Sequence, residues 1–448
     1  MTKLLARSLN LVYITPLSKS ISKGTNGGIN ALHNFFAYEV DAVNVTILSN
    51  ACVTYLMATK WNVNNRDLFE PNGSKLLCKH LSHQLDKYMR EDFTADSKSN
   101  IETFLINGLN LAKMVAKSEN NKFMLMKNGA AEIITLILKI GGTKTAELSE
   151  KACLLMKELC IHDDMRREMS CAVDNGKHFL AAEAIPELLM KFSSAWTLNS
   201  SLASAAMTCA RNLVTTEESV QIMVQNGAMD LPMTILTSSE ASVTLVRSLL
   251  GFMRNLCADD IRKDKFVAMN VLPQMTYIMN NEKYSSDAML IEHGIACWAQ
   301  MALRNPSNSY KIVSCGAIDI TVKSMHRYYD NSALLRQGCL CIRNIAARCL
   351  DLHDTLLDAG VEAVLRIAGK HQAAIDEAYA GLRDLKCEVQ YVKINLEDGS
   401  AVVGDENAYT KKPNFNPIYD DTVDIEKRVE DNAMAPFAAN NVKPFEQL

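Results

Sequence analysis

Apolar residues recur at helical spacing along most of this 448-residue chain. The segment 243–258 shows the pattern clearly, because its apolar residues fall on one face of a helix. This apolar stripe consists of Val243, Val246, Leu250, Met253 and Leu256. A second stripe of small and polar residues falls on another face and consists of Thr244, Ser248, Gly251 and Asn255. The pattern predicts an amphipathic helix in which Asn255 ends a solvent-side track of small residues.

The same helical pattern returns at a regular interval. An Arg-Asn pair closes it at 211–212, 254–255 and 343–344, and Gln300 stands in the same register. The successive spacings from Asn212 to Asn255, Gln300 and Asn344 are 43, 45 and 44 residues. A second marker precedes apolar runs with the same period, at Gly73, Gly129, Glu183, Gly227, Asn270, Gly316 and Gly360. Two markers with one period indicate a tandem repeat of three-helix units.

Each repeat is predicted to contain a short helix, a turn, a middle helix, a loop and a long helix. A glycine suits the turn because it adopts the positive φ that ends helices. The long helices are expected to end near Leu56, Lys113, Glu158, Asn212, Asn255, Gln300, Asn344 and Asp384. Two wider gaps between these ends predict insertions at 90–100 and 171–179.

Over residues 35–390 the chain resembles the armadillo-repeat family. The resemblance rests on the Arg-Asn ends and on three turn segments, namely 226–228, 315–318 and 359–361. Two further segments, 338–347 and 382–389, resemble one subgroup of that family. The resemblance implies an all-α fold, a right-handed α–α superhelix (armadillo-repeat solenoid) whose third helices line a concave groove.

The resemblance also implies a partner-binding site. In groove-binding members the repeated Asn hydrogen-bonds the backbone of an extended peptide. The matching residues are Asn212, Asn255 and Asn344, with Gln300 as a substitute. An amide side chain has both a donor and an acceptor for a peptide unit. The alternative is that each Asn satisfies a neighbouring loop carbonyl near the end of its helix.

Nuclear-import receptors carry a Trp four residues before each Asn, and here those positions hold Thr208, Gly251, Ala296 and Leu340. An import receptor for basic signals is therefore not expected. Instead, an arginine precedes each Asn, at Arg211, Arg254 and Arg343. Guanidinium groups pair bidentately with carboxylates and phosphates, which favours an acidic or phosphorylated protein or peptide segment as the partner. The alternative is that these arginines are solvated or paired within the chain.

The charge is unevenly distributed. Residues 397–448 hold eleven acidic and five basic residues, whereas the whole chain has a net charge of −4. No part has the basic excess typical of a nucleic-acid binder. We expect a flexible segment at 1–34, the repeats at 35–390 and a mostly disordered acidic tail at 391–448. The tail contains an Asn-Pro-x-Tyr turn pattern at 416–419. It also leaves open an alternative function, in which the tail folds back into the groove and makes the protein an autoinhibited adaptor.

Thirteen cysteines, most of them within apolar runs, suggest buried free thiols in a reducing compartment. No apolar run approaches the length of a membrane span. We therefore expect a cytoplasmic monomer that binds neither membrane nor nucleic acid, with the nucleus as an alternative. Residues 1–38 have no acid and four basic residues, so a mitochondrial presequence is a further alternative.

The chain contains no pattern that predicts catalysis. The segment 141–145 has the wrong spacing for a phosphate loop and reads as a connection between helices. Cys78, His80 and His83 are close in sequence but have no fourth ligand at zinc spacing. Cys339 and Cys341 suit packing in a helix. We therefore expect no enzyme, metal or cofactor, and a non-catalytic interaction scaffold, with an enzyme or metal-binding protein as a distant alternative.

Overall fold

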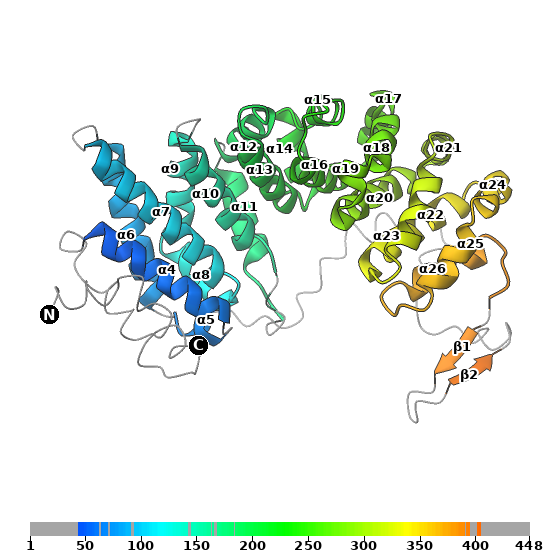
Figure 1. The fold of residues 1–448 in the computed structure, drawn as a ribbon, viewed down its shortest axis with the longest axis horizontal. Helices are drawn as coiled ribbons and strands as arrows, with labels where there is room; N and C mark the ends of the chain where they lie inside the picture. The colour runs from blue at the N-terminus through cyan, green and yellow to red at the C-terminus, as the bar shows by residue number, and fades with distance from the viewer. Residues whose placement is uncertain are drawn as a thin grey trace. The chain divides into compact units, whose positions relative to one another are not determined.

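A computed structural model describes residues 44–61, 64–69, 72–90, 94–141, 145–162, 164, 168–182, 184–389, 391–394 and 401–404. The chain divides into two compact units, Met1–Cys387 and Glu388–Leu448. In the first unit, the described residues form a solenoid of three-helix repeats (Figure 1). None of the described helices is both long and apolar enough to span a bilayer.

The long, third helices of the repeats form one continuous ladder. Each contacts the next in chain order. They are α4 (Val45–Trp61), α7 (Ala95–Val115), α10 (Ala146–Leu159), α13 (Ser200–Leu213), α16 (Val243–Leu256), α20 (Ala288–Ala302), α23 (Ser332–Ala346) and α26 (Ile375–Asp384). Side-chain N-caps explain where several begin, because Asn199, Ser242 and Asp287 each accept a hydrogen bond from a backbone N–H of the first turn.

The first and second helices of each repeat form the other layers. The first helices are α5 (Asn64–Asp67), α8 (Glu119–Lys127), α11 (Ala172–Ala181), α14 (Glu217–Gln225), α17 (Asp260–Ala268), α21 (Pro306–Ser314) and α24 (His353–Asp358). The second helices are α6 (Asn72–Met89), α9 (Ala130–Ile140), α12 (Ala184–Ser194), α15 (Leu231–Leu236), α18 (Val271–Asn280), α22 (Ala317–Arg327) and α25 (Val361–Ala368). Short extra turns lie at α19 (Glu282–Ser285) and η3 (Leu350–Leu352).

The predicted turn between first and second helices is confirmed at most of its markers. A positive φ is found at Gly129, Gly227, Gly316, Gly360 and Asn270. The prediction is wrong at Gly73, which lies inside α6. A Cβ at Gly73 would lie 2.8 Å from the Phe69 ring, so close packing explains that glycine. Glu183 lies outside the described residues.

Apolar burial and polar ties between repeats hold the ladder together. In α16 the predicted stripe is buried except at Val243, which is partly exposed. Arg262 donates two hydrogen bonds to Glu217 of the preceding repeat, at 2.8 and 2.7 Å. The Tyr284 hydroxyl donates to the Ala241 carbonyl at 2.8 Å. These partners are 45 and 43 positions apart, so the hydrogen bonds between repeats follow the repeat period.

The structure corrects both predicted insertions. Residues 172–179 belong to α11, which takes the place of a first helix, and Asn175 Nδ2 donates to the Leu159 carbonyl at 2.8 Å. The extra length lies instead between α10 and α11, after Leu159 and before Ala172. The polar segment 90–100 is not all loop either, because α7 begins at Ala95 behind the N-cap Thr94.

The second unit contains a two-stranded antiparallel sheet. Strand β1 (Tyr391–Ile394) pairs with β2 (Ala401–Gly404), and Tyr391 lies opposite Gly404. These eight residues lie within the segment 391–448, for which the sequence predicts a mostly disordered acidic tail. The turn pattern at 416–419, the rest of the acidic tail and the segment 1–34 lie outside the described residues.

Candidate functional site

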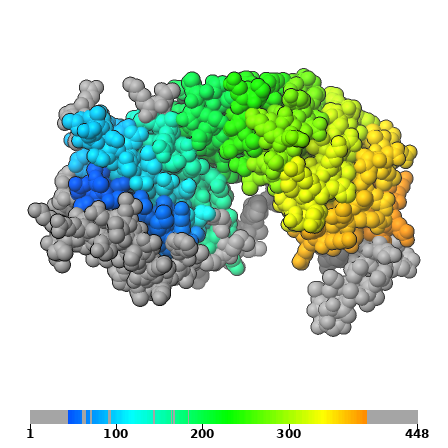
Figure 2. Space-filling view, viewed as in Figure 1, coloured from blue at the N-terminus to red at the C-terminus, as the bar shows by residue number. Residues whose placement is uncertain are grey.

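The predicted site residues occupy the last turns of four successive third helices. Arg211 and Asn212 end α13, and Arg254 and Asn255 end α16. Gln300 lies near the end of α20, and Arg343 and Asn344 near the end of α23. All seven side chains are partly exposed. In the space-filling view the surface of these repeats continues from green to yellow without interruption (Figure 2).

The asparagines hydrogen-bond within the chain. Asn255 Nδ2 donates to the Arg211 carbonyl at 2.9 Å, and Asn344 Nδ2 donates to the Ala299 carbonyl at 2.9 Å. Each accepting carbonyl lies in the last turn of the preceding third helix, where carbonyls lack partners in their own helix. Asn212 differs, because its Nδ2 donates to Thr208 of its own helix at 3.0 Å. The Nδ2 groups of Asn255 and Asn344 therefore link successive repeats, whereas their Oδ1 atoms remain able to accept hydrogen bonds.

This difference predicts unequal effects of substitution. We expect Asn255→Ala and Asn344→Ala each to lower the free energy of unfolding by about 1 kcal/mol, because each removes a hydrogen bond between repeats. Asn212→Ala should cost less, because its bond lies within one helix. Urea unfolding of the three single variants tests this ranking. An equal or larger loss for Asn212→Ala would contradict it.

The small-residue track is less exposed than the sequence predicts. In α16, Ser248 and Gly251 of the predicted track are buried, and Ser248 has an exposed fraction of 8%. Thr208 Oγ1 and Ser248 Oγ lie 3.0 Å apart and share a hydrogen bond between α13 and α16. The small side chains thus let neighbouring third helices pack closely, and the prediction of a solvent-side track is wrong for these residues.

The third helices from α13 to α23 are markedly basic. They carry five arginines and one acidic residue, Glu292. The arginines are Arg211, Arg247, Arg254, Arg336 and Arg343. Three of them have carboxylate partners from neighbouring helices, in the pairs Arg247–Asp287 (2.9 Å), Arg336–Glu377 (2.8 Å) and Arg343–Asp384 (3.8 Å). Within the described part of the chain, Arg254 has no ion pair.

Arg211 has an uncharged partner. Its Nη1 lies 3.0 Å from Nε2 of His293 on α20, 82 positions away. The contact passes over Gly251 of α16, where a Cβ would lie 2.9 Å from both Arg211 Nη1 and His293 Nδ1. His293 Nδ1 lies 3.0 Å from the Arg247 carbonyl. Because a guanidinium only donates, Nε2 must accept and Nδ1 must carry the proton, so His293 is neutral.

Burial and charge act together on this group of residues. Burial, and then the neighbouring Arg211, lower the pKa of His293 to about 4. Burial also lowers the pKa of Arg211, and the charge of Arg254 adds to that effect. Burial raises the pKa of Glu292, while Arg254 and Arg211 oppose that rise. The sequence pattern does not point to His293 or Glu292, and it names Gly251 without assigning it to the site, since none of the three belongs to the repeated Arg-Asn signal.

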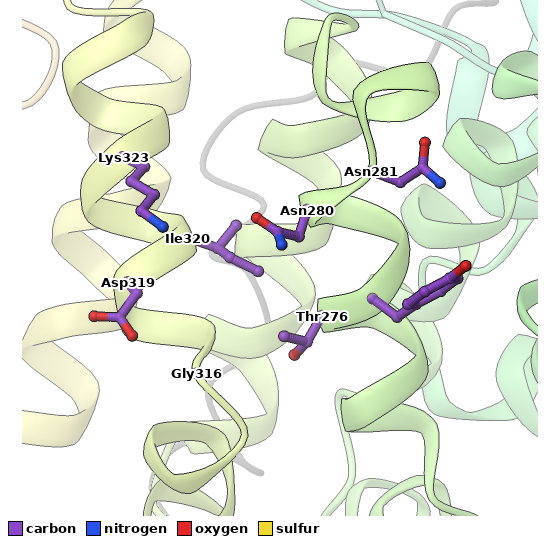
Figure 3. A pocket seen from close by; sticks show the side chains of 8 residues that line it. Thr276, Asn280, Asn281, Gly316, Asp319, Ile320 and Lys323 are labelled. Atoms are coloured by element: carbon purple, nitrogen blue, oxygen red, sulfur yellow. The ribbon is translucent and has the colours of Figure 1, made fainter.

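A separate hollow of about 460 Å³ lies on the layer of second helices. Thr276 and Asn280 project from α18, and Asp319 and Lys323 from α22 (Figure 3). Exposed Tyr277 also lines it. No predicted site residue lines this hollow.

The cysteines and the glycine-rich segment named in the sequence analysis lie in packing or connecting positions. Burial raises the pKa of the Cys78 thiol, and also of Cys339 and Cys341, to about 12 in each case, which suits packing rather than ligation. Within the described residues, no three His, Cys, Asp or Glu side chains are grouped as they would be to hold a metal ion. Gly141 ends α9 and Thr145 precedes α10, so the segment 141–145 connects two helices as predicted.

No protein-family model matches this sequence, and no curated protein matches it. Solved structures are similar in fold. An engineered protein from the Northeast Structural Genomics Consortium is 14% identical, with 84% of this chain and 99% of that chain covered and a TM-score of 0.53. A structure titled for a phosphorylation switch that controls the interaction between cadherin and β-catenin is 15% identical. The match covers 84% of this chain and 66% of that chain, with a TM-score of 0.52. A designed armadillo repeat protein in complex with the peptide (KR)4 is 16% identical. The match covers 56% of this chain and 98% of that chain, with a TM-score of 0.45.

At these identities the likenesses concern the fold alone. The three-helix repeat of about 44 residues, the continuous ladder of third helices and these neighbours agree with one another. The first unit of this chain has the fold of an armadillo-repeat solenoid.

Proposed function

We propose that this protein is a non-catalytic interaction scaffold that binds an extended polypeptide segment along its third helices. The observation that carries this proposal is the row of partly exposed polar side chains at the same position of four successive repeats. Packed helices lie about 8–10 Å apart, and an extended chain advances about 3.3 Å per residue. A bound segment would therefore meet one repeat about every three residues.

The side chains of this row have complementary hydrogen-bonding groups. The Oδ1 atoms of Asn255 and Asn344 would accept from peptide N–H groups, because their Nδ2 atoms already donate within the chain. Gln300 makes no side-chain hydrogen bond to the described residues, so it would offer both a donor and an acceptor. The arginines would pair with acidic or phosphorylated side chains of the segment. The interaction between cadherin and β-catenin, which phosphorylation controls, involves a neighbour of the same fold and favours this class of function.

The test uses random 12-residue peptides displayed on phage and selected against the full chain. Peptides that bind the third-helix surface should bind the double variant Arg254→Ser/Arg343→Ser at least about tenfold more weakly, because charge-assisted hydrogen bonds are lost. The matched control is Lys323→Ser/Arg327→Ser, which removes the same charge from α22. Equal affinities for the two double variants would refute the proposed surface.

Three further proposals follow from the sequence. The acidic tail, mostly outside the described residues, would act as a competitor for the third-helix surface in the alternative of an autoinhibited adaptor. Equal peptide affinity with and without residues 405–448 would refute this alternative. The segments 338–347 and 382–389 suggest a narrower relationship to armadillo repeat-containing protein 6, which stays a proposal, as does a cytoplasmic location.

A further inference from the structure

His293 holds Arg211 in place without neutralising it. Three other arginines of these helices have a carboxylate partner, as in the pair Arg247–Asp287. A neutral imidazole accepts one hydrogen bond from Arg211 and leaves the charge and the other N–H donors of the guanidinium available. Gly251 supplies the space for this contact. Arg211 is therefore a positioned cation with unused donors at the surface of the third helices.

A second cation lies beside the first. Arg254 follows Gly251 by three positions on α16, so both lie on the same face of the helix. Arg254 is near enough to lower the pKa of Arg211 by its charge. Two partly buried guanidinium groups close together repel one another, and that arrangement is favourable only where an anion is nearby.

Glu292 of α20 is an acidic residue within electrostatic reach of both arginines. It neighbours His293 on α20 and is partly exposed. Arg247 of α16 and Asp287, the N-cap residue of α20, form an ion pair with each other. One carboxylate therefore balances two guanidinium groups, and the cluster of Arg211, Gly251, Arg254, Glu292 and His293 keeps one excess positive charge.

We propose that Arg211 and Arg254 bind a phosphorylated serine or threonine of the partner segment, with Gly251 and His293 as positioning residues for Arg211. A phosphate ester carries up to two negative charges and three acceptor oxygens, which matches two guanidinium forks. A single carboxylate, such as that of Glu292, offers fewer acceptor oxygens to the two guanidinium groups, and it competes with the phosphate for them. This inference rests on the proposed function, because it assigns one position of the bound segment.

The experiment compares two oriented libraries of 12-residue peptides with a fixed central serine or phosphoserine. We expect the full chain to bind the phosphoserine library about tenfold or more tightly, since charge-assisted hydrogen bonds are gained. Arg211→Lys and Arg254→Lys should remove most of that preference, because an ammonium keeps the charge but loses the bidentate fork. The matched control, Arg343→Lys, should keep the preference, because Arg343 lies on α23 next to Asp384.

Glu292→Gln is the decisive variant, because it removes the competing carboxylate. We expect it to raise affinity for the phosphoserine library several-fold without raising affinity for the serine library, a gain that misfolding does not produce. If wild type binds both libraries equally, peptide binding stands and the phosphate site is refuted. If neither library binds, both the proposed function and this site are refuted. Loss of the preference in Arg343→Lys as well, or no gain in Glu292→Gln, would also overturn the assignment.

Discussion

Replacing Glu119 by alanine should lower the free energy of unfolding by about 3–5 kcal/mol, because it breaks a buried ion pair by removing its carboxylate. Lys122 has no exposed surface, and its Nζ donates to Glu119 Oε1 at 2.6 Å. Lys122 Nζ also donates to the Ile161 carbonyl. A neutral residue at 119 would remove the carboxylate that accepts from this buried ammonium group.

Glu119 also fixes the irregular connection that replaces the predicted insertion. Its Oε2 accepts from Ser170 Oγ at 2.7 Å and from the Cys171 backbone N–H at 3.3 Å. Its own backbone N–H donates to Asp164 Oδ2 at 3.2 Å. The loss of this carboxylate should therefore loosen the segment between α10 and α11 as well as destabilise α8.

Urea unfolding measures the total effect, and hydrogen exchange of residues 160–175 shows whether the loss is local. The matched control is Asp174→Ala, because Asp174 and Lys177 form an exposed pair at 3.8 Å and such pairs contribute little. The double variant Glu119→Leu/Lys122→Met should regain most of the stability, because it removes both buried charges. A loss below about 1 kcal/mol in Glu119→Ala would show that the pair contributes much less than buried pairs generally do.

The sequence predicted the fold well because each repeat contains the same local signals. The predicted end at Asn212 lies one residue before the end of α13, and the predicted end at Asp384 coincides with the end of α26. The error is larger for α4, which ends at Trp61 rather than near Leu56 and has no Arg-Asn marker. The sequence predicts an insertion where α11 lies, because the position of this helix in the repeat depends on a contact with Leu159 that no local pattern shows.

The site was only partly predictable. Periodicity placed Arg211, Arg254 and Arg343 on equivalent turns, since the first two are one repeat apart and the last two are two repeats apart. It could not show that Arg343 lies near a carboxylate whereas Arg211 meets an imidazole. The Arg211–His293 contact spans two repeats, and it depends on the missing side chain of Gly251. A contact of that kind follows from three-dimensional packing rather than from the repeat.

The stability of the solenoid should fall as the pH is lowered from about 6.5 to about 4, through His293. The unfolded pKa of a histidine is about 6.5, and the folded pKa of His293 is lowered to about 4 by burial and by Arg211. Between these values the unfolded state binds more protons than the folded state. The contribution is therefore fully present above pH 6.5 and is lost as the pH falls. A shift of this size corresponds to about 3 kcal/mol when the loss is complete.

The comparison with His293→Gln isolates this effect from the titration of carboxylates. Glu292 acts in the opposite direction, because a carboxyl group with a raised folded pKa stabilises the folded state as it is protonated. Glutamine does not titrate and keeps both a donor and an acceptor for the Arg247 carbonyl and Arg211. Urea unfolding from pH 7.5 to pH 4 should show a steeper loss for wild type than for His293→Gln. Parallel curves for the two proteins would mean that His293 protonates as readily in the folded state as in the unfolded chain, and that it does not hold Arg211 as a neutral acceptor.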